Sequence, residues 1–171
     1  MRPIHVSGFV VLLTVASGFV ARPALPQDPA KVDAAPQFLT VNFPDAKWEK
    51  MFPEFGANSP EISILRVDPK TQATQLLIRT PTALHVPRHW HSANETHTVV
   101  SGSATFECAG KRETLGPGSF NYIPSKMVHQ AWTSAGHVVF ITVDGAWDIN
   151  WVDGPSKASD VGVSAPAASR P

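Results

Sequence analysis

Short stretches of alternating apolar and polar residues, separated by turn residues, fill the middle of this chain. Residues 61–68, EISILRVD, show the pattern and run into the turn Asp68-Pro69-Lys70-Thr71. Successive side chains of a β-strand point to opposite faces, so a period of two indicates strands. No long stretch has the periodicity of an amphipathic helix. Further stretches of this kind lie at 73–80, 96–102, 103–110, 111–115, 119–124, 129–132 and 137–145. Many short strands predict an all-β domain, either a sandwich or a barrel.

The N-terminal end differs from this pattern. Arg2 and His5 precede an apolar run over residues 6–20, which is the length of a signal-peptide core and short for a membrane-spanning helix. We therefore expect a signal peptide over residues 1–21 and a periplasmic or secreted mature protein with no membrane segment. An uncleaved membrane anchor is the alternative interpretation.

Two further segments are rich in Ala and Pro and poor in large apolar residues. They comprise residues 22–37 and 154–171. Neither offers enough apolar surface to offset the entropy lost on ordering, so we expect a disordered linker and a disordered tail. The folded domain is then expected over residues 38–153.

Composition narrows the candidate functions. The chain has 14 Lys and Arg against 14 Asp and Glu, which gives no basic patch and argues against a nucleic-acid partner. A single cysteine, Cys108, rules out an intrachain disulfide. Five of the seven histidines lie between residues 85 and 129. This clustering of histidines favours a metal-binding site.

The run HWHSANE carries the candidate chemistry. His89 and His91 are two residues apart, so on a strand both project to one face. Glu95 can join them from beyond a short turn, and His129 follows downstream. Neutral imidazoles with one carboxylate suit a divalent first-row metal that keeps open coordination positions.

This region resembles the cupin family. The spacing His89-x-His91-x3-Glu95-x6-Gly102 is similar to the first cupin motif, and Gly118-x5-Pro124 followed by His129 is similar to the second. The resemblance implies a single-domain double-stranded β-helix, that is, a jelly-roll barrel. It also implies one divalent transition metal ion on His89, His91, Glu95 and His129. Iron or manganese is favoured, and zinc, nickel and copper are compatible.

The sequence departs from the cupin motifs at three positions, none of which is a ligand. Ala83 and Lys126 stand where the family has glycine, and Thr133 stands where it has asparagine. Lys126 matters most, because a residue other than glycine puts the usual turn geometry in question.

His97 is the candidate catalytic residue. It lies two residues after Glu95, so a continuing strand would turn it toward the same interior, where it could act as a base or proton shuttle. A core histidine bonded to a neighbouring strand is the alternative. Of the adjacent Asn121 and Tyr122, at most one can face the interior.

Trp90 and Trp132 each lie an odd number of residues from a ligand, which predicts that both face outward. Exposed indoles on a sheet often mark an interface. We therefore expect a homodimer.

The residues and the resemblance together predict an exported, metal-dependent cupin that acts as an enzyme on a small oxygenated organic substrate. Dioxygenase-type chemistry is favoured. The alternatives are a non-oxidative isomerase or lyase acting on a sugar acid, and a non-catalytic module that binds a metal or small ligand.

Overall fold

The computed structural model describes residues 38–167. The expected signal peptide over 1–21 and linker over 22–37 lie outside the described residues and stay predictions. In the described part, no helix is long and apolar enough to cross a membrane.

Eleven strands and three short 3-10 helices make up the described part of the chain. The helices are η1 (Phe43–Asp45), η2 (Pro53–Asn58) and η3 (Ala158–Asp160). The strands are β1 (Glu49–Lys50), β2 (Glu61–Val67), β3 (Thr74–Thr80), β4 (Leu84–Trp90), β5 (Glu95–Ser101), β6 (Ala104–Cys108), β7 (Lys111–Leu115), β8 (Phe120–Ile123), β9 (His129–Thr133), β10 (His137–Val143) and β11 (Asn150–Trp151).

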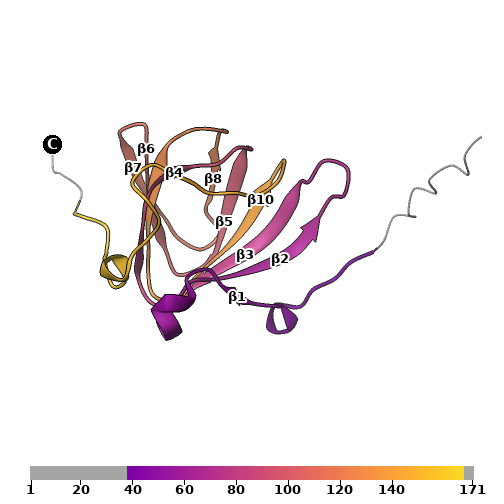
Figure 1. The fold of residues 1–171 in the computed structure, drawn as a ribbon, viewed down its shortest axis with the longest axis horizontal. Coiled ribbons are helices and arrows are strands. Elements are labelled where there is room, and N and C mark those ends of the chain that lie inside the picture. Colours follow the sequence, from indigo (N-terminus) through magenta and orange to yellow (C-terminus); the bar gives the residue numbers. More distant parts are fainter. Residues whose placement is uncertain (1–37, 168–171) are drawn as a thin grey trace, which may run out of the picture. The chain divides into compact units, whose positions relative to one another are not determined.

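The strands form two antiparallel sheets (Figure 1). The first sheet has six strands in the order β1-β2-β3-β10-β5-β8, and the second has five in the order β11-β4-β9-β6-β7. β10 lies between β3 and β5, so strands far apart in the sequence are neighbours. The two antiparallel sheets confirm the expected all-β fold.

The inward face of the six-stranded sheet carries the apolar core. Leu76 of β3 and Val139, Ile141 and Val143 of β10 are all buried and pack together. Ile141 lies directly across from Leu76. Each such side chain removed from water stabilises the fold by roughly 1.5–3 kcal/mol. The alternation seen in the sequence at 137–143 is thus the alternation of core and outer face.

The C-terminal segment differs from the expectation of a disordered tail over 154–171. Up to residue 167 it is packed against the five-stranded sheet. Val161 forms a β-bridge with Leu84, and the Gly162 N–H donates to the Ala83 carbonyl at 2.7 Å. The Asp160 carboxylate lies 3.1 Å from Nδ1 of His85. Ordering comes from these backbone and polar contacts, which a composition poor in large apolar residues does not reveal.

The expectation that both indoles are exposed is wrong for Trp132. Its side chain is only 7% exposed, because His85 stacks on it at 4.9 Å between ring centroids and the Arg112 guanidinium lies 5.3 Å from the ring centroid. Trp90 is half-buried. Trp132 therefore gives no support to a homodimer interface.

Candidate metal centre

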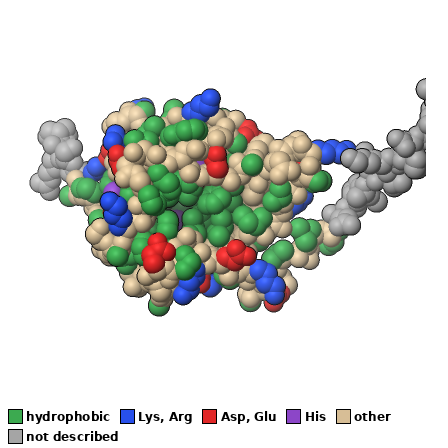
Figure 2. All heavy atoms as spheres, in the orientation of Figure 1, with side chains coloured by type: hydrophobic (Ala, Val, Ile, Leu, Met, Phe, Trp, Pro, Cys, Tyr) green, Lys and Arg blue, Asp and Glu red, His purple; other side chains and the backbone are tan. Residues whose placement is uncertain are grey.

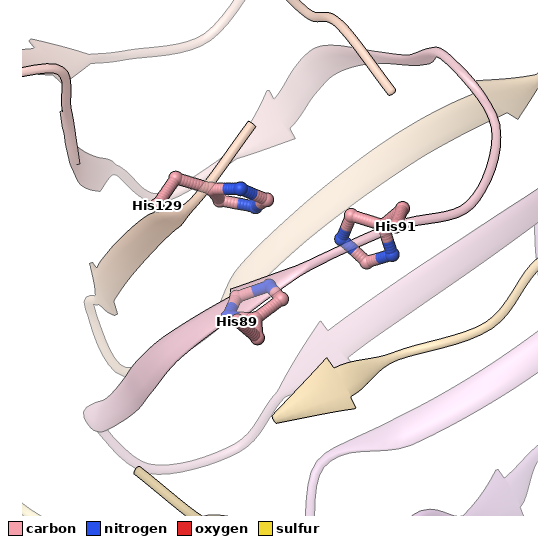
Figure 3. A group of neighbouring side chains, drawn as sticks. All are labelled: His89, His91 and His129. Atoms are coloured by element: carbon pink, nitrogen blue, oxygen red, sulfur yellow. The ribbon is translucent and has the colours of Figure 1, made fainter. Parts of the chain in front are cut away.

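Three histidines from two neighbouring strands converge inside the domain (Figure 3). His89 lies near the end of β4, His91 just after it, and His129 opens β9 directly across from His89. A register shift between Val86 and His89 accompanies Pro87, which has no N–H to donate to the ladder. All three side chains are buried, and one ring nitrogen of each lies within 4.8 Å of the others.

Backbone carbonyls orient all three rings. Nδ1 lies 2.7 Å from the Pro87 oxygen in His89 and 3.0 Å from the Met127 oxygen in His129, and Nδ1 of His91 contacts the Asp148 oxygen. A carbonyl can only accept, so each Nδ1 carries the proton and each Nε2 keeps a free lone pair. Ligating histidines commonly have their second nitrogen held in this way.

Burial keeps two of the three histidines, His89 and His129, uncharged. It lowers the pKa of His89 to about 3, and the neighbouring His129 adds to this effect. Burial likewise lowers the pKa of His129 to about 4, although its bond to the Met127 carbonyl opposes the shift. Both imidazoles are therefore neutral near pH 7, which is the form that binds a metal.

Glu95 lies beside this cluster at the start of β5 and is 1% exposed. Its Oε2 is 3.0 Å from Nε2 of His91 and 3.3 Å from Nε2 of His97, yet it has no hydrogen-bond partner of acceptable geometry. A carboxylate and two imidazole nitrogens with free lone pairs attract one another only through a shared proton or cation. These atoms therefore fit a bound cation, with Glu95 reaching the cluster from the His91 side.

The structure places His97 in the same cavity as Glu95. Its side chain is buried, and Nδ1 lies 2.8 Å from the Asn121 side-chain oxygen on β8. The amide oxygen accepts, so Nε2 toward Glu95 is the basic nitrogen. Asn121 thus faces inward while Tyr122 is 53% exposed. The catalytic role of His97 stays a prediction.

A cavity of about 90 Å³ lies between the two sheets and includes all five of these residues. Most of its remaining wall is apolar. Trp147, Ile149 and Trp151, which alternate in the sequence, all line it. On the face seen in Figure 2, hydrophobic side chains cover the middle, with histidine visible between them. At roughly 30 Å³ per water molecule, the cavity volume corresponds to about three waters, so it suits only a small organic molecule.

A comparison with known protein families identifies the part of the chain that carries the candidate centre. Residues 76–154, which include every residue of the candidate centre, match the family model described as the cupin domain. These residues form a cupin domain. The resemblance drawn from the two motifs is confirmed.

Solved structures share the fold of this cupin domain at low sequence identity. A RmlC-like cupin from Shewanella frigidimarina is 16% identical, with a TM-score of 0.53 over 62% of this chain and 89% of its own. KdgF from Halomonas sp. is 17% identical, with a TM-score of 0.51 over 64% and 94%. The DMSP lyase DddQ from Ruegeria pomeroyi is 18% identical, with a TM-score of 0.50 over 65% and 68%. No curated protein matches by sequence.

The turn at Lys126 in the cupin domain has the backbone conformation of a glycine, although the residue is lysine. Its backbone has a φ of 63°, in the left-handed region that favours glycine, and its N–H donates to the His91 carbonyl at 2.8 Å. The turn is therefore tied to the strand end that carries a candidate ligand. This hydrogen bond helps hold a conformation that is strained for lysine.

Sequence reasoning missed His137 in the cavity of the cupin domain. His137 opens β10, is 2% exposed and lines the cavity. It belongs to the same period-two series as Val139 and Ile141, and that series could have placed it inside. No motif pointed to it, because its spacing matches no metal-ligand pattern.

Proposed function

We propose that the cupin domain is a metal-dependent enzyme that acts on a small oxygenated molecule in its cavity. His89, His91, Glu95 and His129 would hold one divalent transition metal ion. The observation that carries the proposal is the set of three Nε2 lone pairs, fixed by backbone carbonyls and directed into a buried cavity. A bound ion would supply Lewis-acid chemistry and, if it is iron or manganese, redox chemistry.

The charge of the site supports oxygenated substrates. Three neutral imidazoles and one carboxylate would leave a divalent ion with about one net positive charge, which favours anionic oxygen groups. The apolar wall of the cavity excludes water and strengthens that attraction. Small diketones, phenols and hydroxy acids meet both requirements.

Dioxygen-dependent chemistry is the form of the proposal to test first. The protein is first loaded with iron(II) under anaerobic conditions. Oxygen is then admitted, and its uptake is measured with panels of diketones, phenols and thiols as substrates. Uptake that needs both metal and substrate, and is lost in Glu95→Ala, supports a dioxygenase. A ligand that binds and is recovered unchanged under all conditions points instead to a binding module.

A proton-transfer enzyme, either an isomerase or a lyase, is the second candidate. The observation in its favour is His97, whose basic Nε2 faces the centre while Asn121 fixes the other nitrogen. Such a base can remove a proton beside a carbonyl group. Substrate conversion without oxygen uptake, reduced at least tenfold in His97→Gln with metal content unchanged, supports this candidate.

We also propose a homodimer that forms through the six-stranded sheet. Val100, Phe120 and Tyr122 are exposed on the outer face of β5 and β8. Exposed apolar groups of this kind on a sheet favour association. Sedimentation of the wild type and of Phe120→Lys tests this: a dimer that the substitution weakens supports it, and a monomeric wild type contradicts it.

A further inference from the structure

One polar atom of the cavity wall outside the metal centre has no partner. Nδ1 of His137 is buried and makes no hydrogen bond of acceptable geometry within the described residues, although the Ser101 backbone lies close enough to the ring to raise its pKa. A buried polar group without a partner costs about 1–3 kcal/mol, so its retention inside an apolar wall calls for an explanation. A ligand in the cavity would provide the missing partner.

His137 lies at the end of the cavity away from the metal centre. Along the sheet, Glu95 pairs with Val143, the last residue of β10, whereas His137 is its first residue and pairs with Thr80. The hydroxyl groups near His137 are already used: Thr80 donates to the Ser134 carbonyl at 3.3 Å, and Thr133 donates to the Leu84 carbonyl at 3.4 Å. The imidazole is therefore the side chain at this end that lacks a hydrogen bond of good geometry.

The backbone holds His137 in this position. A Cβ added at Gly102, whose φ is +67°, would lie 2.7 Å from the His137 Cα. The strand carrying His137 can approach only because residue 102 has no side chain. Burial also lowers the pKa of His137 to about 4, although the nearby Ser101 backbone opposes the shift, so the ring is a neutral hydrogen-bonding group near pH 7.

We propose that His137 is a substrate-recognition residue that binds a hydroxyl group at the end of the substrate remote from the metal centre. This inference rests on the proposed function. A hydroxyl both donates and accepts, so it can pair with the imidazole in either tautomer of the neutral ring. The substrate class is a short chain with an oxygen ligand at one end, an apolar middle and a hydroxyl at the other end.

A second buried atom without a hydrogen bond supports this orientation of the substrate, with its oxygen ligand at the metal end. Nε1 of Trp147 is buried, lines the same cavity and also lacks an acceptor. Trp147 precedes Asp148, whose carbonyl contacts His91, so it belongs to the metal end. An indole N–H only donates, and an acceptor oxygen on the substrate near the metal would satisfy it.

The test uses cobalt(II)-loaded full-length protein and matched pairs of carboxylic acids. Butanoate, pentanoate and hexanoate are each compared with the acid of the same length that carries a terminal hydroxyl. Dissociation constants are measured by calorimetry, and cobalt content by elemental analysis. For at least one length, the hydroxy acid should bind about threefold to tenfold more tightly than its partner.

The variants separate recognition from folding. His137→Leu should abolish or reverse the preference, since a buried hydroxyl then lacks a partner, while His137→Gln should retain part of it. Thr80→Val, at the same end, should keep the full preference because its hydroxyl already has a partner. All three variants should still unfold in one cooperative transition and keep the cobalt content of wild type.

Two results overturn the inference and are distinguishable. If wild-type protein binds cobalt but shows no hydroxyl preference at any length, or if the preference survives in His137→Leu, the role of His137 is wrong. If wild-type protein takes up no cobalt, the proposed metal centre fails, and the inference fails with it.

Discussion

At the scale of single residues, the cavity of this protein combines neutral histidines with a buried carboxylate. Burial lowers the pKa of His89 to about 3 and of His129 and His137 to about 4. In the unfolded chain each imidazole titrates near 6.5. The folded state thus excludes protons that the unfolded state binds, and stability becomes linked to pH.

This linkage predicts that the metal-free protein loses stability on mild acidification. Above about pH 6.5 the contribution is fully present, and it falls as the pH drops toward 4, because only the unfolded chain gains protons there. Urea unfolding of chelator-treated protein at pH 7.5, 6 and 5 measures the effect. His137→Gln should show a shallower decline, and a free energy of unfolding that does not fall over this range contradicts the account.

The turn at Lys126 leads to a second prediction. Its φ of 63° is strained for any residue with a Cβ, so Lys126→Gly should raise the free energy of unfolding by about 1 kcal/mol. Lys126→Ala is the matched control, since it removes the charge but keeps the strain, and it should change stability little. Chemical denaturation compares the three proteins. Equal effects of the two substitutions would show that the change in the free energy of unfolding comes from the loss of the lysine side chain and not from relief of backbone strain.

At the scale of elements, the sequence predicted strands well and the C-terminal segment poorly. Period-two patterns such as EISILRVD and HVVFITV coincide with β2 and β10. In β10 the pattern reflects one face on the core, where Val139, Ile141 and Val143 are buried. The segment after residue 153 lacks such a pattern. Its order depends on a bridge from Val161 to Leu84 and an ion pair between Asp160 and His85, which are contacts that no local pattern encodes.

Removing the C-terminal segment should therefore destabilise the barrel. A chain ending at Asp153 loses the contacts of residues 154–167 with β4, including Asp160, which holds the ring stacked on Trp132. We expect a loss of about 2 kcal/mol and greater quenching of tryptophan fluorescence by iodide. A chain ending at residue 167 is the control and should behave as wild type. Unchanged stability and quenching in the shorter chain would contradict this role.

At the scale of the whole molecule, the candidate centre depends on pairing between distant strands. His89 and His129 are neighbours only because β9 pairs with β4, and Glu95 joins from the opposite sheet. Spacing within HWHSANE predicted the local part of this set, and the motif resemblance supplied His129. His137 could not be assigned a role from sequence, because its significance lies in a missing partner inside a three-dimensional cavity.

Metal binding should stabilise the entire domain, since the ligands come together only in the folded state. A metal at 100 times its dissociation constant adds about 2.7 kcal/mol to the free energy of unfolding. Thermal unfolding with and without added manganese(II) or iron(II) measures the shift. Glu95→Gln should reduce it, and the absence of any shift with all first-row divalent ions argues against the centre.

The most direct test of the central claim is the metal content of the purified protein beside two variants. His129→Ala removes a candidate ligand, whereas Gln130→Ala alters the adjacent residue, whose side chain bonds His85 and Glu107 instead. We expect about one equivalent of a divalent transition metal in wild type and Gln130→Ala, and almost none in His129→Ala. Equal metal content in all three proteins, or none in any of them after reconstitution, would contradict a metal centre built on these histidines.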